Sequence, residues 1–489
     1  MRCVAFDLGA SSGKLFAGTI EGSRLKVEPV HSFPNAICSF SGGLYWDFFG
    51  IQREMNAGIR KAAASGPVDS FGVDSFNNDF SLIDKNGELL LPVRSYRDAR
   101  TEKYAGEIYA CIPREKLYAY TGNQLAPFNT FMQLAAMSLA GQTSVFDAAD
   151  KLLLLPDLLG FSITGEKVAE YTVAAETQFL DLNRKTWIHE IPGAFDVPAR
   201  IFPDVVNPGT ITGRASRAWC DENGVSPFRF VSVCEHDTAS AFAAAPGGKS
   251  AAYLSSGTWS LVGLEVPAPI VTQESFAFNI ANEGGWPGYH RLIKNVMGFW
   301  ILQELLKEYA AEGHIYSFPE AQQLAREAEP FRFLFDPDAP EFFRPGQIRR
   351  KIRIACLAST GCAPETPGEF FRCIYEGLAL RYRRALHMLQ SVSGKKVDRI
   401  NILGGGSRDA LACQLTADAT GLPVLAGPAD ATAIGNILVQ MIALGEIKDL
   451  SEGRELVACS FEYASYEPTD SARWEEHYRR FEETFPLVY

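Results

Sequence analysis

The sequence predicts an α/β fold built from two related domains, and three observations lead to this expectation. The chain has 489 residues, more than the roughly 250–300 at which one hydrophobic core stops growing. An apolar strand, a glycine-rich turn and a second apolar strand occur at residues 4–20 and again at 251–266. A strand, a glycine loop, a helix and another strand follow one another at 398–427, as expected in an α/β fold.

The first predicted element is a β-hairpin at residues 4–20, VAFDLGASSGKLFAGTI, because apolar residues lie on both sides of its turn. Gly9, Gly13 and Lys14 suggest a phosphate-binding P-loop. However, the spacing is one residue short, and Leu15 stands where Ser or Thr would hold magnesium. The turn is therefore expected to close a hairpin and not to form a Walker A motif.

Repetition of this hairpin at half the chain length indicates an internal duplication, and hence two domains that face each other rather than a solenoid. No linker rich in Pro, Gly or Ser separates the halves, so we expect a packed hinge near residues 243–250. The predicted domains are 1–245 and 246–489, and we consider that the last helices pack back on the first domain.

Further elements agree with this fold class and are predicted from apolar periodicity and from turn residues. They are strands at 71–76, 80–84 and 228–234, a long amphipathic helix at 368–392, and a helix from about 409 to 420 that is closed by Gly421.

Composition and charge exclude several classes of protein. Hydrophobic residues make up 47% and charged residues 21%, which is typical of a globular enzyme or scaffold protein. No apolar run approaches the roughly 20 residues that a membrane span needs, and no leader-like segment precedes the first strand, so we expect a cytoplasmic protein. The net charge of −12 disfavours nonspecific binding to nucleic acid. Ten cysteines without a CxxC pair predict reduced thiols, with a local bridge among Cys356, Cys362 and Cys373 as the alternative.

The glycine turns are candidate phosphate sites. Backbone amides in such turns can bind phosphate oxygens, because no side chain blocks the approach. Two turns, one in each domain, would hold one polyphosphate from both sides; the alternative is that both are ordinary hairpin turns. Residues 404–407, GGGS, lie between a strand and a helix, where a nucleotide can bind. Asp409 stands at the third glycine position of the dinucleotide fingerprint, so an NAD enzyme is not expected.

Two aspartates are candidates for chemistry. Asp237, in VCEHDTASAFAAA at 233–245, fits two roles equally well: an N-cap of the following helix, or a general base at the carboxyl end of a strand. His236 has no HExxH or HxxxH partner, so we expect it to form hydrogen bonds or contact a substrate rather than bind a metal. Asp7 lies in an otherwise apolar strand, and a Mg²⁺ ion reached through water would offset the cost of burying its charge.

Several segments occur in a specific order between residue 3 and about residue 447: DLGASSGK, HDTASAFAA, YLSSGTWSLVG, NEGGWPG, LIKNVMGFWILQE and GGGSRDALACQLTADATGLPV. Together they resemble the FGGY carbohydrate kinases, and within them the rhamnulokinases most closely. The resemblance implies two actin-like, or ribonuclease H-like, domains with ATP and a sugar in the cleft between them.

The resemblance also implies roles for particular residues. The residues implied to bind ATP are Ala10, Ser11, Ser12, Gly13 and Lys14 in the first domain and Thr258, Gln303 and Gly404 in the second. The residues implied to contact the sugar are His236, Asp237, Thr238 and Asn295, with Asp237 as the proton acceptor.

The implied chemistry is phosphoryl transfer from MgATP to a ketose, at its 1-hydroxyl group. Such a reaction needs positioning and charge stabilisation more than covalent help. Asp237 would orient the hydroxyl group and accept its proton, while magnesium and the turn amides offset charge on the phosphoryl oxygens. Domain closure would exclude water.

One departure from the family pattern concerns specificity. Rhamnulokinases have Thr-Trp-Gly-Val-Asp where this chain has Ser-Phe-Asn-Asn-Asp at 75–79. Asn77 and Asn78 bring amide groups to a strand that approaches the sugar, so Asn77 is a predicted substrate contact and the choice of sugar can be redirected. L-rhamnulose is the first expected substrate, and L-fuculose or another pentulose or hexulose is the alternative.

A different class of protein is also considered: an actin-like, ATP-dependent binding or regulatory protein without sugar kinase activity. The Asp237 segment and the Asn295 segment argue against it. The expected partners are a small ketose and ATP, with no nucleic acid and no membrane, and the chain is expected to be a monomer or a homodimer.

Overall fold

The computed structural model describes residues 1–248 and 250–487, which form two compact units. The first unit comprises Met1–Gly247, Glu265–Leu292 and Ala431–Ser460, and the second comprises Gly248–Leu264, Ile293–Asp430 and Phe461–Tyr489. The chain first passes from the first unit to the second after Gly247, two residues beyond the predicted boundary at 245. A single division there would assign 265–292 and 431–460 to the second unit, whereas their contacts lie within the first.

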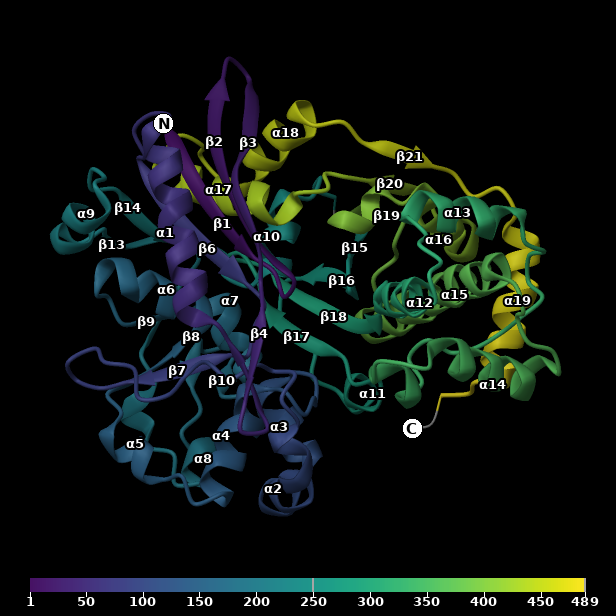
Figure 1. The fold of residues 1–489 in the computed structure, drawn as a ribbon, viewed down its shortest axis with the longest axis horizontal. Coiled ribbons are helices and arrows are strands. Elements are labelled where there is room, and N and C mark those ends of the chain that lie inside the picture. The colour runs from purple at the N-terminus through teal and green to yellow at the C-terminus, as the bar shows by residue number, and fades with distance from the viewer. Residues whose placement is uncertain (249, 488–489) are drawn as a thin grey trace. The chain divides into compact units, whose positions relative to one another are not determined.

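A six-stranded sheet forms the centre of the first unit, in the order β13-β14-β6-β1-β2-β3 (Figure 1). β1 runs antiparallel to β2 and parallel to β6, and β6 runs parallel to β14. The predicted first hairpin and the predicted strands near 71–76 and 228–234 are therefore confirmed. The strands are β1 (Arg2–Leu8), β2 (Ser12–Glu21), β3 (Arg24–Pro34), β6 (Ser70–Ser75), β13 (Thr210–Arg214) and β14 (Arg229–Ser232).

Helices cover both faces of this sheet. On one face, α1 (Phe48–Ala64) and α6 (Leu155–Thr164) pack on alternate residues of β1 such as Val4 and Phe6. On the other face lies α17 (Ala431–Ala443), whose buried amides bond to the strand backbone: Asn436 Nδ2 donates to Gly72 O and Gln440 Nε2 donates to Val4 O. α10 (Asp237–Ala244) packs beside α17. Because side chains alternate along a strand, Asp7 belongs to the α17 face.

A second hydrophobic cluster in the first unit is built mainly from helices around a short antiparallel pair of strands, β7 and β8, which confirms the strand predicted at 80–84. Its elements are β7 (Phe80–Ile83), α2 (Ala105–Cys111), α3 (Arg114–Thr121), α4 (Thr130–Leu139), α5 (Ser144–Ala148), β8 (Lys151–Leu154) and α8 (Glu190–Gly193). The remaining elements of the unit are β4 (Ile37–Phe40), β5 (Gly43–Trp46), β9 (Val168–Glu170), α7 (Tyr171–Ala174), β10 (Leu180–Asp181), β11 (Thr186–Trp187), β12 (Asp204–Val206), α9 (Arg217–Asn223), α11 (Gln273–Ala277), β17 (Ala281–Gly284) and α18 (Leu450–Ser460).

The second sheet has the order β17-β18-β16-β15-β19-β20-β21. Its run β18-β16-β15-β19-β20 repeats the run β3-β2-β1-β6-β14 of the first sheet, and β15 is likewise antiparallel to its hairpin partner and parallel to β19. The predicted duplication is thereby confirmed. The strands are β15 (Ala251–Ser256), β16 (Trp259–Val266), β18 (His290–Met297), β19 (Arg399–Leu403), β20 (Val424–Ala426) and β21 (Ala464–Tyr466).

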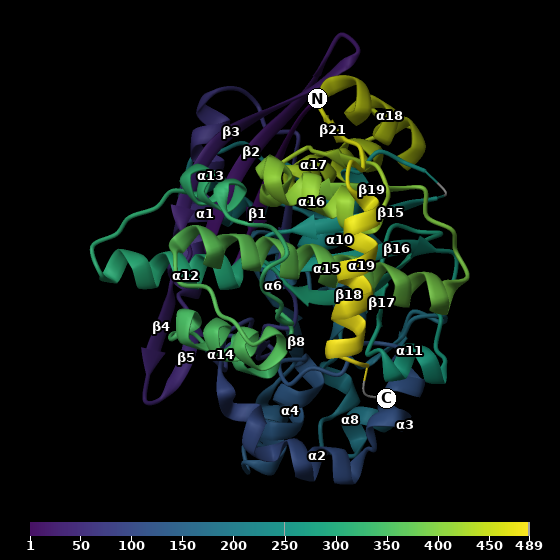
Figure 2. The same cartoon turned by 90° about the vertical axis from the view of Figure 1, so that its right-hand side faces the viewer.

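Local sequence signals explain the ends of the longest helix in the second unit, which was predicted at 368–392 and spans Pro367–Ser393 as α15. Thr366 and Glu369 form a capping box at its start, and Gly394 adopts a left-handed conformation at its end. Figure 2 shows α19 lying over α15 and α16. The helices of the unit are α12 (Trp300–Ala311), α13 (Phe318–Glu327), α14 (Ile348–Thr360), α15, α16 (Ala410–Thr420) and α19 (Ser471–Thr484).

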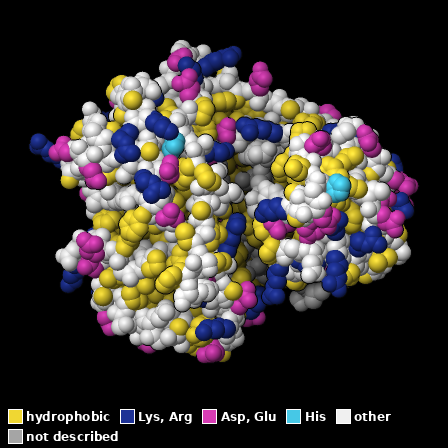
Figure 3. Space-filling model, viewed as in Figure 1, with side chains coloured by type: hydrophobic (Ala, Val, Ile, Leu, Met, Phe, Trp, Pro, Cys, Tyr) yellow, Lys and Arg dark blue, Asp and Glu magenta, His cyan; other side chains and the backbone are white. Residues whose placement is uncertain are grey.

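On the surface, acidic and basic side chains are interspersed with apolar ones over the face drawn in Figure 3. Within 1–248 and 250–487, no helix combines the length and the apolarity that crossing a bilayer requires. All ten cysteines are free thiols, and the closest predicted pair, Cys356 and Cys373, has its sulfur atoms 3.6 Å apart.

Candidate active site

The first cluster of candidate residues lies at the start of α10 in the first unit. Asp237 is the first residue of the helix, and His236 is the N-cap, so the N-cap interpretation of Asp237 is wrong. Its Oδ1 instead accepts hydrogen bonds from the backbone N–H and the Oγ1–H of Thr238. The side chain is 32% exposed, and burial of the rest raises the pKa of Asp237 above its usual value.

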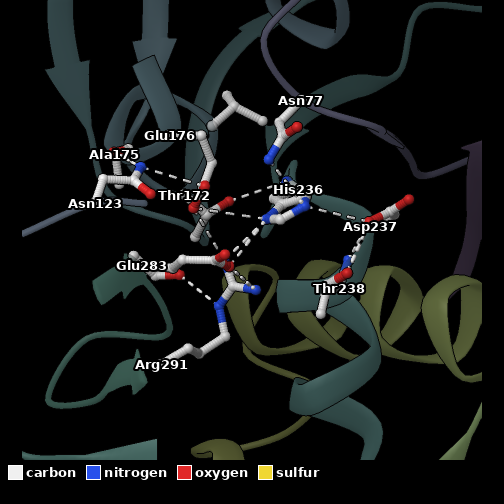
Figure 4. A network of polar contacts seen from close by, with 12 residues as sticks. Asn77, Asn123, Thr172, Ala175, Glu176, His236, Asp237, Thr238, Glu283 and Arg291 are labelled. Carbon is white, nitrogen blue, oxygen red and sulfur yellow. Dashed lines mark hydrogen bonds and ion pairs between the residues drawn. The ribbon is translucent and has the colours of Figure 1, made fainter. Parts of the chain in front are cut away.

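His236 and Asn77 face each other beside Asp237 (Figure 4). His236 Nε2 lies 3.4 Å from Asp237 Oδ1 and 3.3 Å from Asn77 Nδ2. Asn77 belongs to the connection between β6 and β7. The structure therefore brings together four of the predicted sugar contacts, with Thr238 as the fourth.

Asn78, next in the chain, has a different role from Asn77. It is buried and adopts a left-handed backbone conformation with φ 73°. Its carbonyl oxygen accepts hydrogen bonds from Thr130 Oγ1 and Gln133 Nε2, at 3.0 and 3.1 Å. Asn78 therefore anchors the connection to α4, and Asn77 carries the amide that faces His236.

Behind His236 lies a buried group of charges that sequence reasoning missed. Arg291, on β18, is 1% exposed and contacts Glu283 Oε2 through Nη1 at 2.8 Å and His236 Nδ1 through Nη2 at 3.0 Å (Figure 4). Glu176 Oε1 lies 3.8 Å from Arg291 Nη2. Glu176, His236 and Glu283 offer ligand atoms within 4.8 Å of one another. The guanidinium group already contacts all three, so the arrangement favours an ion-pair network over a metal site.

Three carboxylates, those of Asp7, Asp74 and Asp237, lie near one another at the end of the first sheet. Asp7 on β1 and Asp74 on β6 are neighbours in the parallel register. Burial, followed by repulsion from Asp7 and Asp237, raises the pKa of Asp74 well above its usual value. Asp74 Oδ2 accepts a hydrogen bond from Asn436 at 2.6 Å, and its buried Oδ1 has no hydrogen-bond partner among the described residues. A hydrated divalent cation fits such a donor set.

The turn that contains Ala10, Ser11 and Ser12 is held by its own backbone: Gly9 N–H donates to Ser12 O at 2.9 Å. A Cβ atom at Gly13 would come within 2.3 Å of the Phe33 ring, so packing alone requires glycine there. Lys14 is the cross-strand partner of Asp7. Both side chains therefore emerge on the same face of the sheet.

The second cluster is a pocket of about 380 Å³ in the second unit, lined by the turn after β15, α12, α13 and the loop after β19. Gln303, Phe299 and Phe318 contribute side chains to it. The carbonyl groups of Gly257 and Thr258 accept hydrogen bonds from the first amides of α12, at 2.9 and 3.1 Å. These bonds hold Thr258 Oγ1 at 3.5 Å from Gln303 Oε1.

Gly404 directly precedes two glycines that line this pocket, and it adopts φ 77°. A Cβ atom at Gly406 would lie 2.1 Å from Ser256 Oγ, so the loop packs against the end of β15 without room for a side chain. Asn295 lies on β18 within the second unit. The structure thus groups Thr258, Gln303 and Gly404 in the second unit and the cluster at the start of α10 in the first.

Some of the missed residues carried a signal in the sequence. Asp74 interrupts an apolar strand just as Asp7 does, and the parallel pairing of their strands places them side by side. Arg291 shares its strand with a second cation, Lys294, so its charge alone gave no such signal. Nothing in the sequence showed that Glu176 and Glu283 would meet it.

Comparison with known proteins agrees with the fold. Residues 46–244 match the N-terminal domain, and residues 252–444 the C-terminal domain, of the FGGY family of carbohydrate kinases. A protein named rhamnulokinase from Bacteroides thetaiotaomicron is 37% identical over 479 residues, covering 98% of each chain. Another, from Enterococcus faecalis, is 36% identical over 96% of this chain and 95% of its own.

Solved structures share the fold at low sequence identity. A ligand-bound xylulose kinase from Lactobacillus acidophilus gives a TM-score of 0.83 at 17% identity, covering 99% of this chain and 97% of its own. The Plasmodium falciparum glycerol kinase with ADP gives a TM-score of 0.78 at 15% identity, covering 100% of this chain and 99% of its own. The predicted pair of related α/β domains is confirmed, and the chain belongs to the FGGY family of carbohydrate kinases, enzymes that transfer a phosphoryl group to a sugar.

Proposed function

We propose that the chain transfers the γ-phosphoryl group of ATP to the 1-hydroxyl group of L-rhamnulose. The relatives named rhamnulokinases support this substrate, since their similarity extends over nearly the whole chain. The observation that carries the proposal is the setting of Asp237. Thr238 holds Oδ1 in place, while Oδ2 has no hydrogen-bond partner within 1–248 and 250–487 and the side chain remains partly exposed.

On the sugar side, Asp237 Oδ2 would accept the proton of the attacking hydroxyl group. General bases of this kind contribute about 10²–10⁴-fold to a rate. The raised pKa of Asp237 brings its basicity closer to neutral pH, which suits a proton acceptor. His236, Thr238, Asn77 and Asn295 are the proposed sugar contacts.

On the nucleotide side, we assign ATP to the pocket of the second unit, because its volume and its apolar lining fit a purine base. Gln303 and the loop at Gly404 would line the base, and Thr258 would contact a phosphate group. Ala10, Ser11, Ser12, Gly13 and Lys14 are proposed phosphate contacts from the first unit.

Magnesium would be held near Asp7 and Asp74. The unpartnered oxygen of Asp74 and the mutual repulsion of the carboxylates support this assignment. When bound, the ion offsets negative charge on the transferred phosphoryl group. Lys14, on the same face of the sheet as Asp7, adds a positive charge beside it.

The proposal is tested by measuring ADP release from MgATP with L-rhamnulose, L-fuculose, L- and D-xylulose, L- and D-ribulose, and glycerol. We expect the highest kcat/KM with L-rhamnulose. A higher value for L-fuculose or another ketose would replace the substrate and keep the reaction. An equally slow release of ADP with and without every sugar would favour the ATP-dependent binding protein instead. A cytoplasmic location and the choice between monomer and homodimer stay predictions.

A further inference from the structure

Arg291 fixes the protonation pattern of His236. Its Nε donates to Gly284 O at 2.7 Å, Nη1 pairs with Glu283 at 2.8 Å, and Nη2 lies 3.0 Å from His236 Nδ1 (Figure 4). A guanidinium group keeps its protons and can only donate. His236 Nδ1 must therefore be the acceptor, which leaves the proton of a neutral imidazole on Nε2.

The surrounding charges agree with a neutral His236. A protonated ring would direct a second N–H at the Arg291 donor, and the nearest carboxylate oxygens, on Glu283 and Glu176, lie 3.6 and 3.9 Å from Nδ1. Burial and the charge of Arg291 lower the pKa of His236 well below its usual value. Burial raises the pKa of both Glu176 and Glu283, and repulsion by Glu283 adds to the shift of Glu176. Glu283 is the nearer carboxylate to the guanidinium group, at 2.8 Å from Nη1, whereas Glu176 lies 3.8 Å from Nη2.

A second chain of hydrogen bonds orients Asn77. The backbone N–H of Thr130 can only donate, and it donates to Asn78 Oδ1 at 3.2 Å. The amide nitrogen of Asn78 therefore donates to Asn77 Oδ1, at 2.7 Å. This in turn directs the Nδ2 of Asn77 at His236, so two donors, Asn77 Nδ2–H and His236 Nε2–H, approach each other at 3.3 Å.

We propose that these two groups form a two-donor subsite, in which His236 Nε2–H and Asn77 Nδ2–H together bind one acceptor oxygen of the sugar. This inference rests on the proposed function. Two donors cannot bond to each other, so an oxygen placed between them satisfies both. The subsite lies beside Asp237, whose Oδ1 is 3.4 Å from His236 Nε2. The sugar oxygen that fits is the one at C2, next to the reacting 1-hydroxyl group, because a keto oxygen accepts and does not donate.

In this subsite Asn77 and His236 contact the sugar, and Arg291 is a positioning residue that acts through His236. The first test measures the side-chain ¹⁵N shifts of the protein's seven histidines, with His236→Asn to assign the signal. We expect an unprotonated Nδ1 and a protonated Nε2. In the double variant Arg291→Met/Glu283→Gln, which removes both charges together, this single tautomer should be lost.

Arg454→Met/Glu265→Gln is the matched control, because Arg454 of this largely buried ion pair donates to the carbonyl groups of Phe242 and Ala243 at the other end of α10. It should leave the His236 signals unchanged. A protonated Nδ1 in the unmodified protein, or a tautomer that survives the Arg291 double variant, would overturn the proposal.

The second test compares Asn77→Ala with Asn77→Asp. Loss of one donor should raise the KM for the ketose about 10-fold in the alanine variant, and the aspartate variant should raise it more, about 100-fold, because a carboxylate repels an acceptor oxygen. The KM for ATP should stay unchanged in both. If Asn77 served packing alone, the isosteric aspartate would lie nearer to the unmodified protein than alanine does.

That reverse order of KM values would refute the subsite. Asn183→Asp, an exposed position in the same unit, controls for the added charge and should behave as the unmodified protein does. The tautomer measurement needs no turnover. Absence of kinase activity with every ketose would therefore count against the proposed function, while the ¹⁵N shifts would still judge the donor geometry.

Discussion

Equivalent positions of the two sheets carry opposite chemistry. In the first unit, two residues before the turn glycine, Asp7 on β1 is the neighbour of Asp74 on β6. In the second unit the corresponding neighbours are Ser255 on β15 and Leu403 on β19. The strand order is the same, so the difference lies in the side chains. It favours a division of roles in which one copy of the scaffold gathers the charges for phosphoryl transfer and the other binds the nucleotide.

The buried acidic residues of the two units also differ in whether each has an arginine partner. In the second unit Glu376 pairs with Arg372 at 2.5 Å, and Asp338 pairs with Arg381 at 2.6 Å. In the first unit, burial raises the pKa of Glu170 to about 7, and the pKa of Glu235 is raised by burial and by repulsion from Asp157 and Glu170. The first unit thus keeps carboxylates together without an arginine for each, which costs stability.

The largest expected effect comes from Asp237→Asn. The amide keeps the shape of the side chain but cannot accept the proton of the sugar hydroxyl group. We expect kcat to fall about 10²–10⁴-fold, with the affinity for ATP changed less than twofold, as measured by ADP release and by nucleotide titration. Turnover at the unmodified rate would remove Asp237 from the role of base and weaken the proposed division of roles.

The comparison of the two sheets is tested directly by Leu403→Asp. Leu403 is fully buried, and the corresponding position of the first unit is Asp74. A carboxylate there has neither the Asn436 partner nor a neighbouring cation site, so we expect the free energy of unfolding to fall by about 3–5 kcal/mol. Leu403→Asn is the control for shape and polarity without charge. Equal stability of the two variants in denaturant titrations would show that the second sheet tolerates a buried charge.

Much of the fold could be predicted because its signals are local. The two hairpins have a glycine turn between apolar runs, and α15 has a capping box at one end and a glycine at the other. The assignment of α17 could not be predicted. Its sequence, ATAIGNILVQMIA, holds no charged residue, and its only polar side chains are those of Thr432, Asn436 and Gln440. Such a pattern shows that a helix is buried but not which sheet it covers. Asn436 and Gln440 decide this, by bonding to strands more than 360 residues away.

The candidate site likewise contains residues that local sequence signals predict and residues that only the fold brings together. Asp237, His236 and Thr238 are contiguous in sequence, so one motif placed all three together. The partner that fixes the His236 ring, Arg291, lies 55 residues further along the chain. Its approach depends on how β18 packs, which short-range patterns do not encode. Asn77 was noticed as a departure from a family pattern, but its direction depends on Asn78 and Thr130.

A smaller effect concerns the pH dependence of stability in the first unit. Burial raises the pKa of Asp79 from 3.8 to about 7, against hydrogen bonds from Trp46 and Tyr96. A carboxyl group with a raised folded-state pKa stabilises the protein fully below pH 4 and loses this contribution as the pH rises to about 7. The free energy of unfolding of Asp79→Asn should therefore fall less steeply as the pH rises. Its slope should differ from that of the unmodified protein by at most about 1.4 kcal/mol per pH unit.

The control for this measurement is Asp84→Asn in the same unit, a partly exposed position where N–H groups lower the pKa of the carboxyl group. The pH dependence of the Asp84 contribution has the opposite sign, because a carboxyl group with a lowered pKa adds stability as the pH rises above its folded-state pKa. Denaturant titrations from pH 4 to pH 8 measure both variants. A constant difference between Asp79→Asn and the unmodified protein over this range would show that burial does not set the charge of Asp79.

The smallest expected effect sharpens the nucleotide half of the comparison. Gln303 lies one turn into α12, lines the pocket of the second unit and faces Thr258. Gln303→Ala removes one polar contact worth about 1 kcal/mol, so the KM for ATP should rise about 3- to 10-fold. The KM for the ketose should stay the same, because the sugar contacts of the first unit are untouched. Gln323→Ala on α13, whose amide bonds to Glu327 outside the pocket, is the control and should change neither value. A rise in the KM for the ketose alone would place Gln303 on the sugar side and contradict the separation of roles between the two sheets.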